Sequence, residues 1–166
     1  MISVIKDNIV NLDVDCIVNA ANTSLAGGGG VDGAIHEVAG KKLYEACNKI
    51  GYCAIGDAVI TPGFNLKAKY IIHTVGPIYN RFDENNCKQL LTNCYKNSLD
   101  LARKYNIHSI AFPCISSGVY GYPIDKSANI AITTVKNWLN LNSYDIDVKL
   151  VCFTQKEYET YENINR

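Results

Sequence analysis

A carboxylate and an imidazole stand four residues apart, directly after a run of glycines. The run is Gly27–Gly30, and Asp32 and His36 follow it. The apolar spacing of this segment predicts a helix, in which residues i and i+4 share one face. Such a pair can activate a water molecule or orient a hydroxyl group. The alternative is that Asp32 only caps the helix and that His36 is a buried structural histidine.

The glycine run is suited to binding a phosphate group. Consecutive glycines cost backbone entropy, so the fold must need their torsions or their lack of a Cβ atom. A glycine loop that leads into a helix presents free N–H groups to an anion. Gly28, Gly30 and Gly33 also match the dinucleotide pattern G-x-G-x-x-G. That match is superficial, because the first glycine does not follow its strand directly and the acidic residue expected about 20 residues later is missing.

A second loop, Ser116–Gly121, is also rich in small residues. Its N–H groups could form an anion-binding nest, and Tyr120 offers a flat face to a sugar or a base. An ordinary crossover with a structural tyrosine explains the loop equally well. A nucleophilic serine is disfavoured, because the sequence is not G-x-S-x-G.

The elements that must position these loops alternate between strands and helices. Three segments have helical spacing, Val31–Ile50, Asn86–Tyr105 and Asp125–Leu141, with Asn106 as a stop and Asp125 as a possible cap. Six short runs, several of them apolar throughout, are predicted as strands: Ile2–Lys6, Cys16–Ala20, Asp57–Thr61, Tyr70–Val75, Ser109–Pro113 and Val148–Phe153. The pattern predicts a single α/β domain over residues 1–166, a three-layer α/β/α sandwich with a mostly parallel central sheet. Ligands in such sheets bind beyond the carboxyl ends of the strands, where both loops fall.

Composition narrows the class of protein. Lys+Arg and Asp+Glu both number 16, so nucleic acid is not a favoured partner. The seven cysteines form no C-x-x-C pair, which disfavours a zinc ribbon, and reduced thiols suggest the cytoplasm. No apolar run approaches the length of a membrane span, and the first residues do not resemble a signal peptide. We expect a cytoplasmic monomer with no membrane partner.

Four stretches together resemble the macro domain family, and within it the MacroD-type branch. They are Val18–Asn22, Gly28–His36, Ile71–Pro77 and Ser109–Pro123. The resemblance spans roughly residues 2 to 155, which is nearly the whole chain. The motifs are long and occur in the family's order.

The resemblance implies a ligand and a site. The ligand would be ADP-ribose, with its diphosphate between the two glycine-containing loops. Asn22 would hydrogen-bond the distal ribose, Asp32 would activate water, and His36 would orient the ribose or Asp32. Val31 and Tyr120 would clamp the diphosphate and the distal ribose. The full set of implied ligand-binding residues is Asn8, Ile9, Ala21, Asn22, Gly29, Gly30, Val31, Asp32, Ser116, Ser117, Gly118, Val119, Tyr120 and Phe153.

The implied activity is hydrolysis. The enzyme would remove mono-ADP-ribose from Glu or Asp side chains of modified proteins and would deacetylate O-acetyl-ADP-ribose. It would need no cofactor and no metal, because the zinc-dependent macro domains carry Cys and His in the loop that is Asn22–Gly30 here. The alternatives are a non-catalytic reader of ADP-ribosylated proteins and an ADP-ribose 1″-phosphatase.

The sequence departs from the family pattern at the adenine end. Members usually carry Gly-Asp-Ile-Thr, with the Asp reading the adenine amine, where this chain has Asp7–Val10. Asn8 would then accept from that amine without a charge, or Asp7 would take its place. Phe153 is the first choice to stack on adenine, and Tyr158 is its rival. Two further residues are expected to be structural: Asn19, which would tie backbone groups together, and His73.

Overall fold

A computed structural model describes residues 1–166 and shows one six-stranded sheet, in the order β1-β6-β5-β2-β4-β3. All pairs are parallel except β3 with β4. The predicted mostly parallel sheet is therefore confirmed, and each strand begins and ends within two residues of its predicted bounds. The strands are β1 (Ile2–Lys6), β2 (Cys16–Ala20), β3 (Ala58–Pro62), β4 (Tyr70–Thr74), β5 (Ser109–Phe112) and β6 (Asp147–Cys152).

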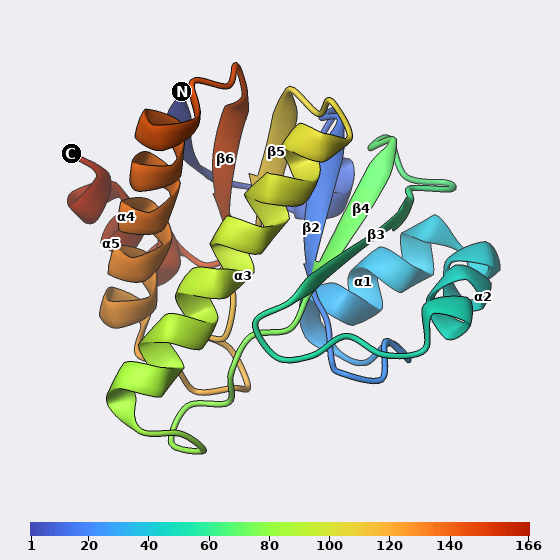
Figure 1. Ribbon diagram of the computed structural model, residues 1–166, viewed down its shortest axis with the longest axis horizontal. Helices are drawn as coiled ribbons and strands as arrows, with labels where there is room; N and C mark the ends of the chain where they lie inside the picture. The colour runs from blue at the N-terminus through green and yellow to red at the C-terminus, as the bar shows by residue number, and fades with distance from the viewer.

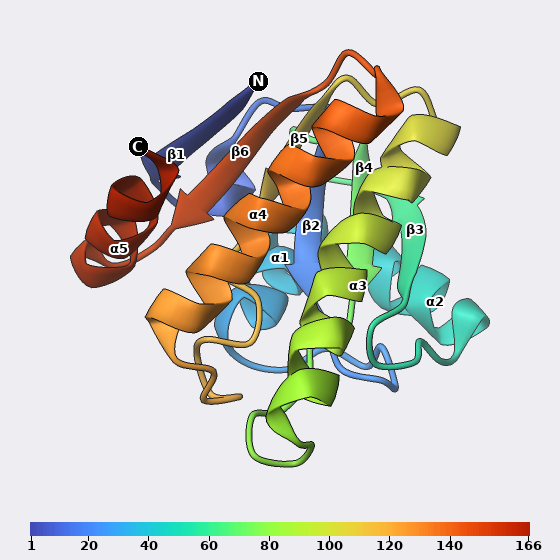
Figure 2. The same cartoon turned by 60° about the vertical axis from the view of Figure 1, so that its left-hand side comes forward.

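Helices cover both faces of this sheet (Figures 1 and 2). They are α1 (Gly30–Ala39), α2 (Lys41–Ile50), α3 (Glu84–Lys104), α4 (Ile124–Asn142) and α5 (Gln155–Asn165), with a short 3-10 helix, η1 (Ile9–Asn11). Side chains alternate along β2, so that Cys16 and Val18 join the core under α3, α4 and α5, while Ile17 joins the core under α1 and α2. The three-layer α/β/α sandwich is confirmed. No helix is long and apolar enough to cross a membrane.

Three details of the helices differ from the prediction. The single helix expected over Val31–Ile50 is wrong, because the chain turns at Gly40, whose φ of 93° favours glycine. The proposed cap Asp125 is also wrong: Pro123 occupies the N-cap position and Asp125 lies in the first turn of α4. Finally, α5 was not predicted, although Thr154 and Glu157 form the capping box that begins it.

The carboxyl ends of the parallel strands gather four chain segments at one edge of the sheet (Figure 1). β2 leads into the glycine loop and α1, and β5 leads into the loop Ser116–Gly121 and α4. β1 leads to Asp7 and η1, and β6 leads to Phe153 and α5. This is the edge at which the sequence predicts ligand binding.

Gly76, just after β4, leaves room for the loop Ser116–Gly121. A Cβ atom at Gly76 would collide with Ser116 Oγ and with the side chain of Ile115. Ser116 has a φ of 67°, and its hydroxyl donates to the Pro77 carbonyl at 2.8 Å. The hydrogen bond ties the two segments together at a distance that only a glycine at position 76 allows.

We therefore predict that Gly76→Ala destabilises the protein. Because the buried methyl group must displace Ser116 and Ile115, we expect a loss of about 1–3 kcal/mol in the free energy of unfolding, measured as a lower urea midpoint. Gly118→Ala is the control, since a Cβ atom there meets nothing within 4 Å. Equal midpoints for the two variants would contradict this account of Gly76.

Candidate active site

A cavity of about 690 Å³ lies at the carboxyl edge of the sheet. It is lined by every residue predicted to bind the ligand except Ser117, whose hydroxyl turns back to the Cys114 carbonyl at 3.3 Å. Three acidic side chains line it, Asp7, Asp32 and Glu157, and no lysine or arginine does. Any anion bound here must therefore be held by groups other than basic side chains.

Asp32 lies in the first turn of α1 and is 6% exposed. One carboxylate oxygen, Oδ1, accepts a hydrogen bond from Asn19 Nδ2 at 2.8 Å and lies 3.4 Å from His36 Nε2. The other, Oδ2, lies 3.4 Å from the position where a Cβ atom of Gly28 would stand. Burial raises the pKa of Asp32, while Asn19 and His36 act in the opposite direction. The carboxylate is thus held by one oxygen, and the other faces the glycine loop.

His36 contacts Asp32 and does not line the cavity. It is 2% exposed and packs against Tyr44, with 4.2 Å between ring centroids and the rings tilted by 37°. Burial lowers the pKa of His36, and the negative charge of Asp32 opposes this shift. Of its two expected roles, the contacts favour orienting Asp32 over orienting a ribose.

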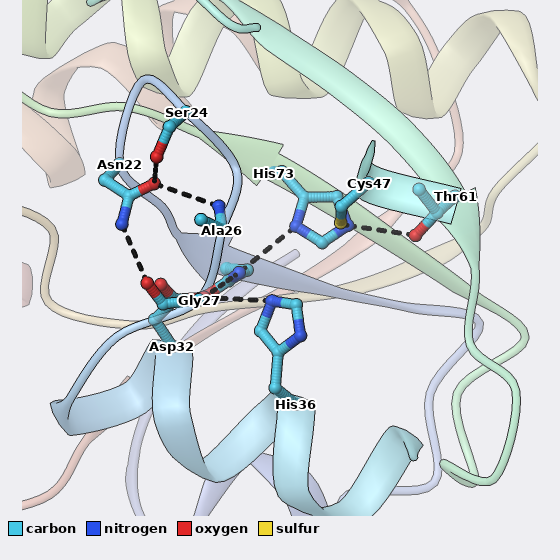
Figure 3. A network of polar contacts seen from close by, with 10 residues as sticks. Asn22, Ser24, Ala26, Gly27, Asp32, His36, Cys47, Thr61 and His73 are labelled. Carbon is cyan, nitrogen blue, oxygen red and sulfur yellow. Dashed lines mark hydrogen bonds and ion pairs between the residues drawn. The ribbon is translucent and has the colours of Figure 1, made fainter. Parts of the chain in front are cut away.

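The Asn22 side chain makes three hydrogen bonds, all to residues of its own loop (Figure 3). Its amide nitrogen donates to the Gly27 carbonyl at 2.9 Å, and its oxygen accepts from Ser24 Oγ and from the Ala26 N–H. One N–H remains for a ligand, since an amide nitrogen carries two. Nδ2 also lies 3.8 Å from the Cβ position of Gly28, so Asn22 and Asp32 face the same space. Asn22 is therefore placed to donate to a ribose but not to accept from it.

Asn19 does more than the sequence suggested. The expectation that it ties backbone groups is wrong, because its amide nitrogen reaches two side chains, Asp32 Oδ1 at 2.8 Å and His73 Nδ1 at 3.1 Å. Asn19 and His73 are paired residues of β2 and β4, and both are fully buried. Burial lowers the pKa of His73 to about 3, with a contribution from His36. The sequence signal for this contact is a polar residue inside each of two apolar strands.

The N-terminus of α1 supplies groups that suit a phosphate. No side chain caps it, and Gly29, Gly30 and Val31 line the cavity there. The first N–H groups of a helix have no partner within it and carry partial positive charge, so they can bind an anion. At Gly29, Gly30 and Gly118, a Cβ atom would meet nothing within 4 Å, which leaves the backbone of both loops open.

An aromatic ring and two polar side chains meet at the far end of the cavity. Phe153 lines it and is 75% exposed, whereas its rival Tyr158 does not line it. The Asp7 N–H donates to the Cys152 carbonyl at 3.1 Å, which brings the ends of β1 and β6 together. Asp7 accepts from the Asn8 N–H, and Asn8 Oδ1 accepts from the Val10 N–H at 3.3 Å. The amide oxygen expected to read adenine therefore already accepts one hydrogen bond and has one lone pair left.

A match to a family model identifies the family to which this fold and cavity belong. The model described as "Macro domain" matches residues 18–131, which include the glycine loop, α1 and the loop Ser116–Gly121. The chain belongs to the macro domain family. The family predicted from the four motifs is confirmed.

Named relatives extend this macro domain's similarity over nearly its whole length. The chain is 51% identical over 162 residues to "ADP-ribose glycohydrolase MACROD2" of Xenopus laevis, covering 97% of this chain and 39% of the relative. The solved Oceanobacillus iheyensis macrodomain with ADP is 42% identical with a TM-score of 0.94, covering 98% of this chain and 88% of that one. The Trypanosoma brucei macrodomain in complex with ADP-ribose is 41% identical with a TM-score of 0.91, covering 98% and 68%. The similarity to the MacroD-type branch is confirmed, for a chain that spans about two fifths of that relative.

No group of three or more His, Cys, Asp or Glu side chains is arranged to hold a metal ion. The seven cysteines are free, and most are buried within the two cores. Independence from metal stays a prediction for this macro domain.

The buried charge of Asp32 predicts a stability cost. Because its pKa is raised by folding, the folded state holds this proton more tightly, so stability is lost as pH rises through the folded-state pKa. Asp32→Asn should keep the contact with Asn19 and remove the cost. We expect a gain of about 0.5–2 kcal/mol at pH 7 in urea unfolding.

The pH dependence provides the check. Below the ordinary pKa of a carboxyl group, Asp32 is protonated in both the folded and the unfolded states, so the difference from Asn should shrink toward zero at pH 3. The effect of His73 on acid stability is common to both proteins and cancels. A gain of equal size at both pH values would show that the charge is not its source.

Proposed function

We propose that this macro domain binds ADP-ribose and hydrolyses the bond between its distal ribose and a carboxylate group, on a protein Glu or Asp side chain or in O-acetyl-ADP-ribose. The observation that carries the proposal is the convergence of Asp32 Oδ2 and Asn22 Nδ2 on the space above Gly28, at the end of the cavity opposite Phe153. A base and a donor that meet at one point suit a water molecule and a ribose hydroxyl group.

The order of features along the cavity supports ADP-ribose as the ligand. Phe153 offers a face for adenine stacking beside Asp7 and Asn8. The uncapped N-terminus of α1 and the backbone of the loop Ser116–Gly121 offer N–H groups for the diphosphate. The relatives agree, since one is named as an ADP-ribose glycohydrolase and one was solved in complex with ADP-ribose.

The chemistry follows from the free oxygen of Asp32. As the oxygen of a water molecule bonds to the anomeric carbon of the distal ribose, Oδ2 takes its proton. The bond from that carbon to the carboxylate oxygen breaks, and the carboxylate leaves as an anion. On O-acetyl-ADP-ribose the same water attacks the acetyl carbonyl carbon, and the bond from that carbon to the ribose oxygen breaks. The ribose oxygen takes the proton held by Asp32, and acetic acid is released and ionises to acetate. Burial raises the pKa of Asp32, which makes it a stronger base than an exposed aspartate.

Release of ADP-ribose from a Glu-modified protein tests this function. We expect the wild type to release it and Asp32→Asn to lose at least about a hundredfold in rate, since positioned general bases contribute ~10²–10⁴-fold. Calorimetry should show that both proteins bind ADP-ribose. Asp147→Asn is the matched control, because Asp147 lies at the opposite end of β6 from the cavity.

The assay separates the alternatives. Binding without release, in the wild type and the variant alike, would identify a reader and leave Asp32 as a helix-end carboxylate. Release of phosphate from ADP-ribose 1″-phosphate in place of ADP-ribose from protein would identify the phosphatase. Equal release by the wild type and Asp32→Asn would remove Asp32 from the mechanism.

The adenine end predicts that Asn8→Asp tightens ADP-ribose binding. Asn8 offers a neutral oxygen that already accepts from the Val10 N–H, whereas an aspartate brings a negative charge and a second oxygen to accept from the adenine amine. A charge-assisted hydrogen bond is worth about 1.5–3 kcal/mol, so we expect about a tenfold lower Kd by calorimetry. ADP-ribose with the 6-amino group replaced by hydrogen is the control ligand and should gain nothing. Identical Kd values for both proteins would show that the departure at Asn8 has no effect.

A further inference from the structure

Four buried polar side chains form a chain of hydrogen bonds beneath the cavity, each on a different element. Thr61 Oγ1 on β3 lies 2.9 Å from His73 Nε2 on β4, and His73 Nδ1 lies 3.1 Å from Asn19 Nδ2 on β2. Asn19 Nδ2 donates in turn to Asp32 Oδ1 on α1 at 2.8 Å. Thr61 is 3% exposed, and Asn19 and His73 are fully buried. In Figure 3, Asn22 lies to the left of the Asp32 carboxylate, and His73 and Thr61 lie to its right.

Donors and acceptors can be assigned to this series of hydrogen bonds in one way only, with each donor pointing away from Asp32 or toward it as its partners require. Asn19 Nδ2 carries two hydrogens, and its two partners are Asp32 Oδ1 and His73 Nδ1. His73 Nδ1 is then the acceptor, so its proton is on Nε2 and is donated to Thr61. Burial keeps this imidazole neutral, because it lowers the pKa of His73 to about 3.

The reversed arrangement would be unfavourable for Asp32. If His73 carried its proton on Nδ1, that N–H would face the N–H of Asn19. The amide would have to turn, and its oxygen would then face the Asp32 carboxylate. In the observed orientation Asn19 Oδ1 is buried without a hydrogen-bond partner. The amide is therefore held through its nitrogen alone, by acceptors on both sides.

We propose that Thr61, His73 and Asn19 are positioning residues, which set the direction of this chain so that Asp32 is held by Oδ1 and keeps Oδ2 free as the base. The proposal rests on the hydrolase function above. Thr61 and His73 act through Asn19, because neither lines the cavity.

The other titratable groups around Asp32 are few. His36 lies beside it on α1, and Cys47 on α2 has its sulfur 3.9 Å from His73 Nε2. Asp7 and Glu157 line the same cavity but follow β1 and β6, which lie three and two strands away from β2. The acidic limb of the pH profile should therefore report mainly on Asp32 and its direct partners.

Thr61→Val tests the proposal, because it removes the acceptor for His73 Nε2–H with little change in shape and far from the ligand. We expect kcat/KM for ADP-ribose release to fall about tenfold on the acidic side, the acidic limb to move to higher pH, and the Kd for ADP-ribose to stay unchanged. Asn19→Leu, which removes both donors, should show the same shift with a larger loss. Thr74→Val is the matched control: Thr74 is the next residue of β4, fully buried, and its hydroxyl donates to the Asp57 carbonyl.

Two NMR measurements keep the proposal separate from the hydrolase function. Ring ¹⁵N spectra should show His73 protonated on Nε2 in the wild type, and ¹³C titration should show a higher Asp32 pKa in Thr61→Val than in Thr74→Val. If the wild type releases no ADP-ribose, the hydrolase function fails and these spectra still decide the network. A wild-type His73 protonated on Nδ1, or a folded Thr61→Val with an unchanged Asp32 titration, would overturn the proposal.

Discussion

The main constraint on this site is the unfavourable free energy of burying the Asp32 carboxylate. A charge removed from water must be compensated by hydrogen bonds or neutralised. Here the N-terminus of α1 supplies partial positive charge, and Asn19 supplies a direct hydrogen bond to one oxygen. The hydrogen bond from Asn19 reaches Oδ1 alone. The second oxygen therefore has no side-chain donor and faces the glycine loop.

The anion site likewise depends on backbone groups. The chain has no net charge and places no basic side chain in its cavity. Backbone N–H groups must then do what lysine and arginine do elsewhere, and they must be held in position. Glycines make this possible through close contacts: a Cβ atom at Gly33 would collide with the Gly28 carbonyl, and one at Gly27 would lie 2.9 Å from the Tyr44 ring. The glycine loop is therefore closely packed at Gly27 and Gly33 and open at Gly29 and Gly30.

What could be predicted from the sequence depended on how local the signal was. The strands were readable because their buried residues form short continuous apolar runs. Gly40 was missed because the apolar spacing continues through it, from Ile35 in α1 to Leu43 in α2. The last helix, α5, was missed because it buries only Tyr161 completely, so its spacing is weak. The two loops that line the cavity could be located because glycine runs and strand ends are visible in the sequence itself.

The contacts that hold Asp32 could not be predicted from the sequence, for a physical reason. Asn19 and His73 are 54 positions apart, and only the parallel register of β2 and β4 makes them neighbours. Polar side chains inside apolar strands are expensive unless they are paired, so each implies a partner without naming it. The site also leaves Asn19 Oδ1 and His36 Nδ1 buried and unpaired. Each of these atoms costs stability, because it has lost its hydrogen bonds to water. Their presence next to Asp32 is understandable if the orientation of one carboxylate matters more than the stability that it costs.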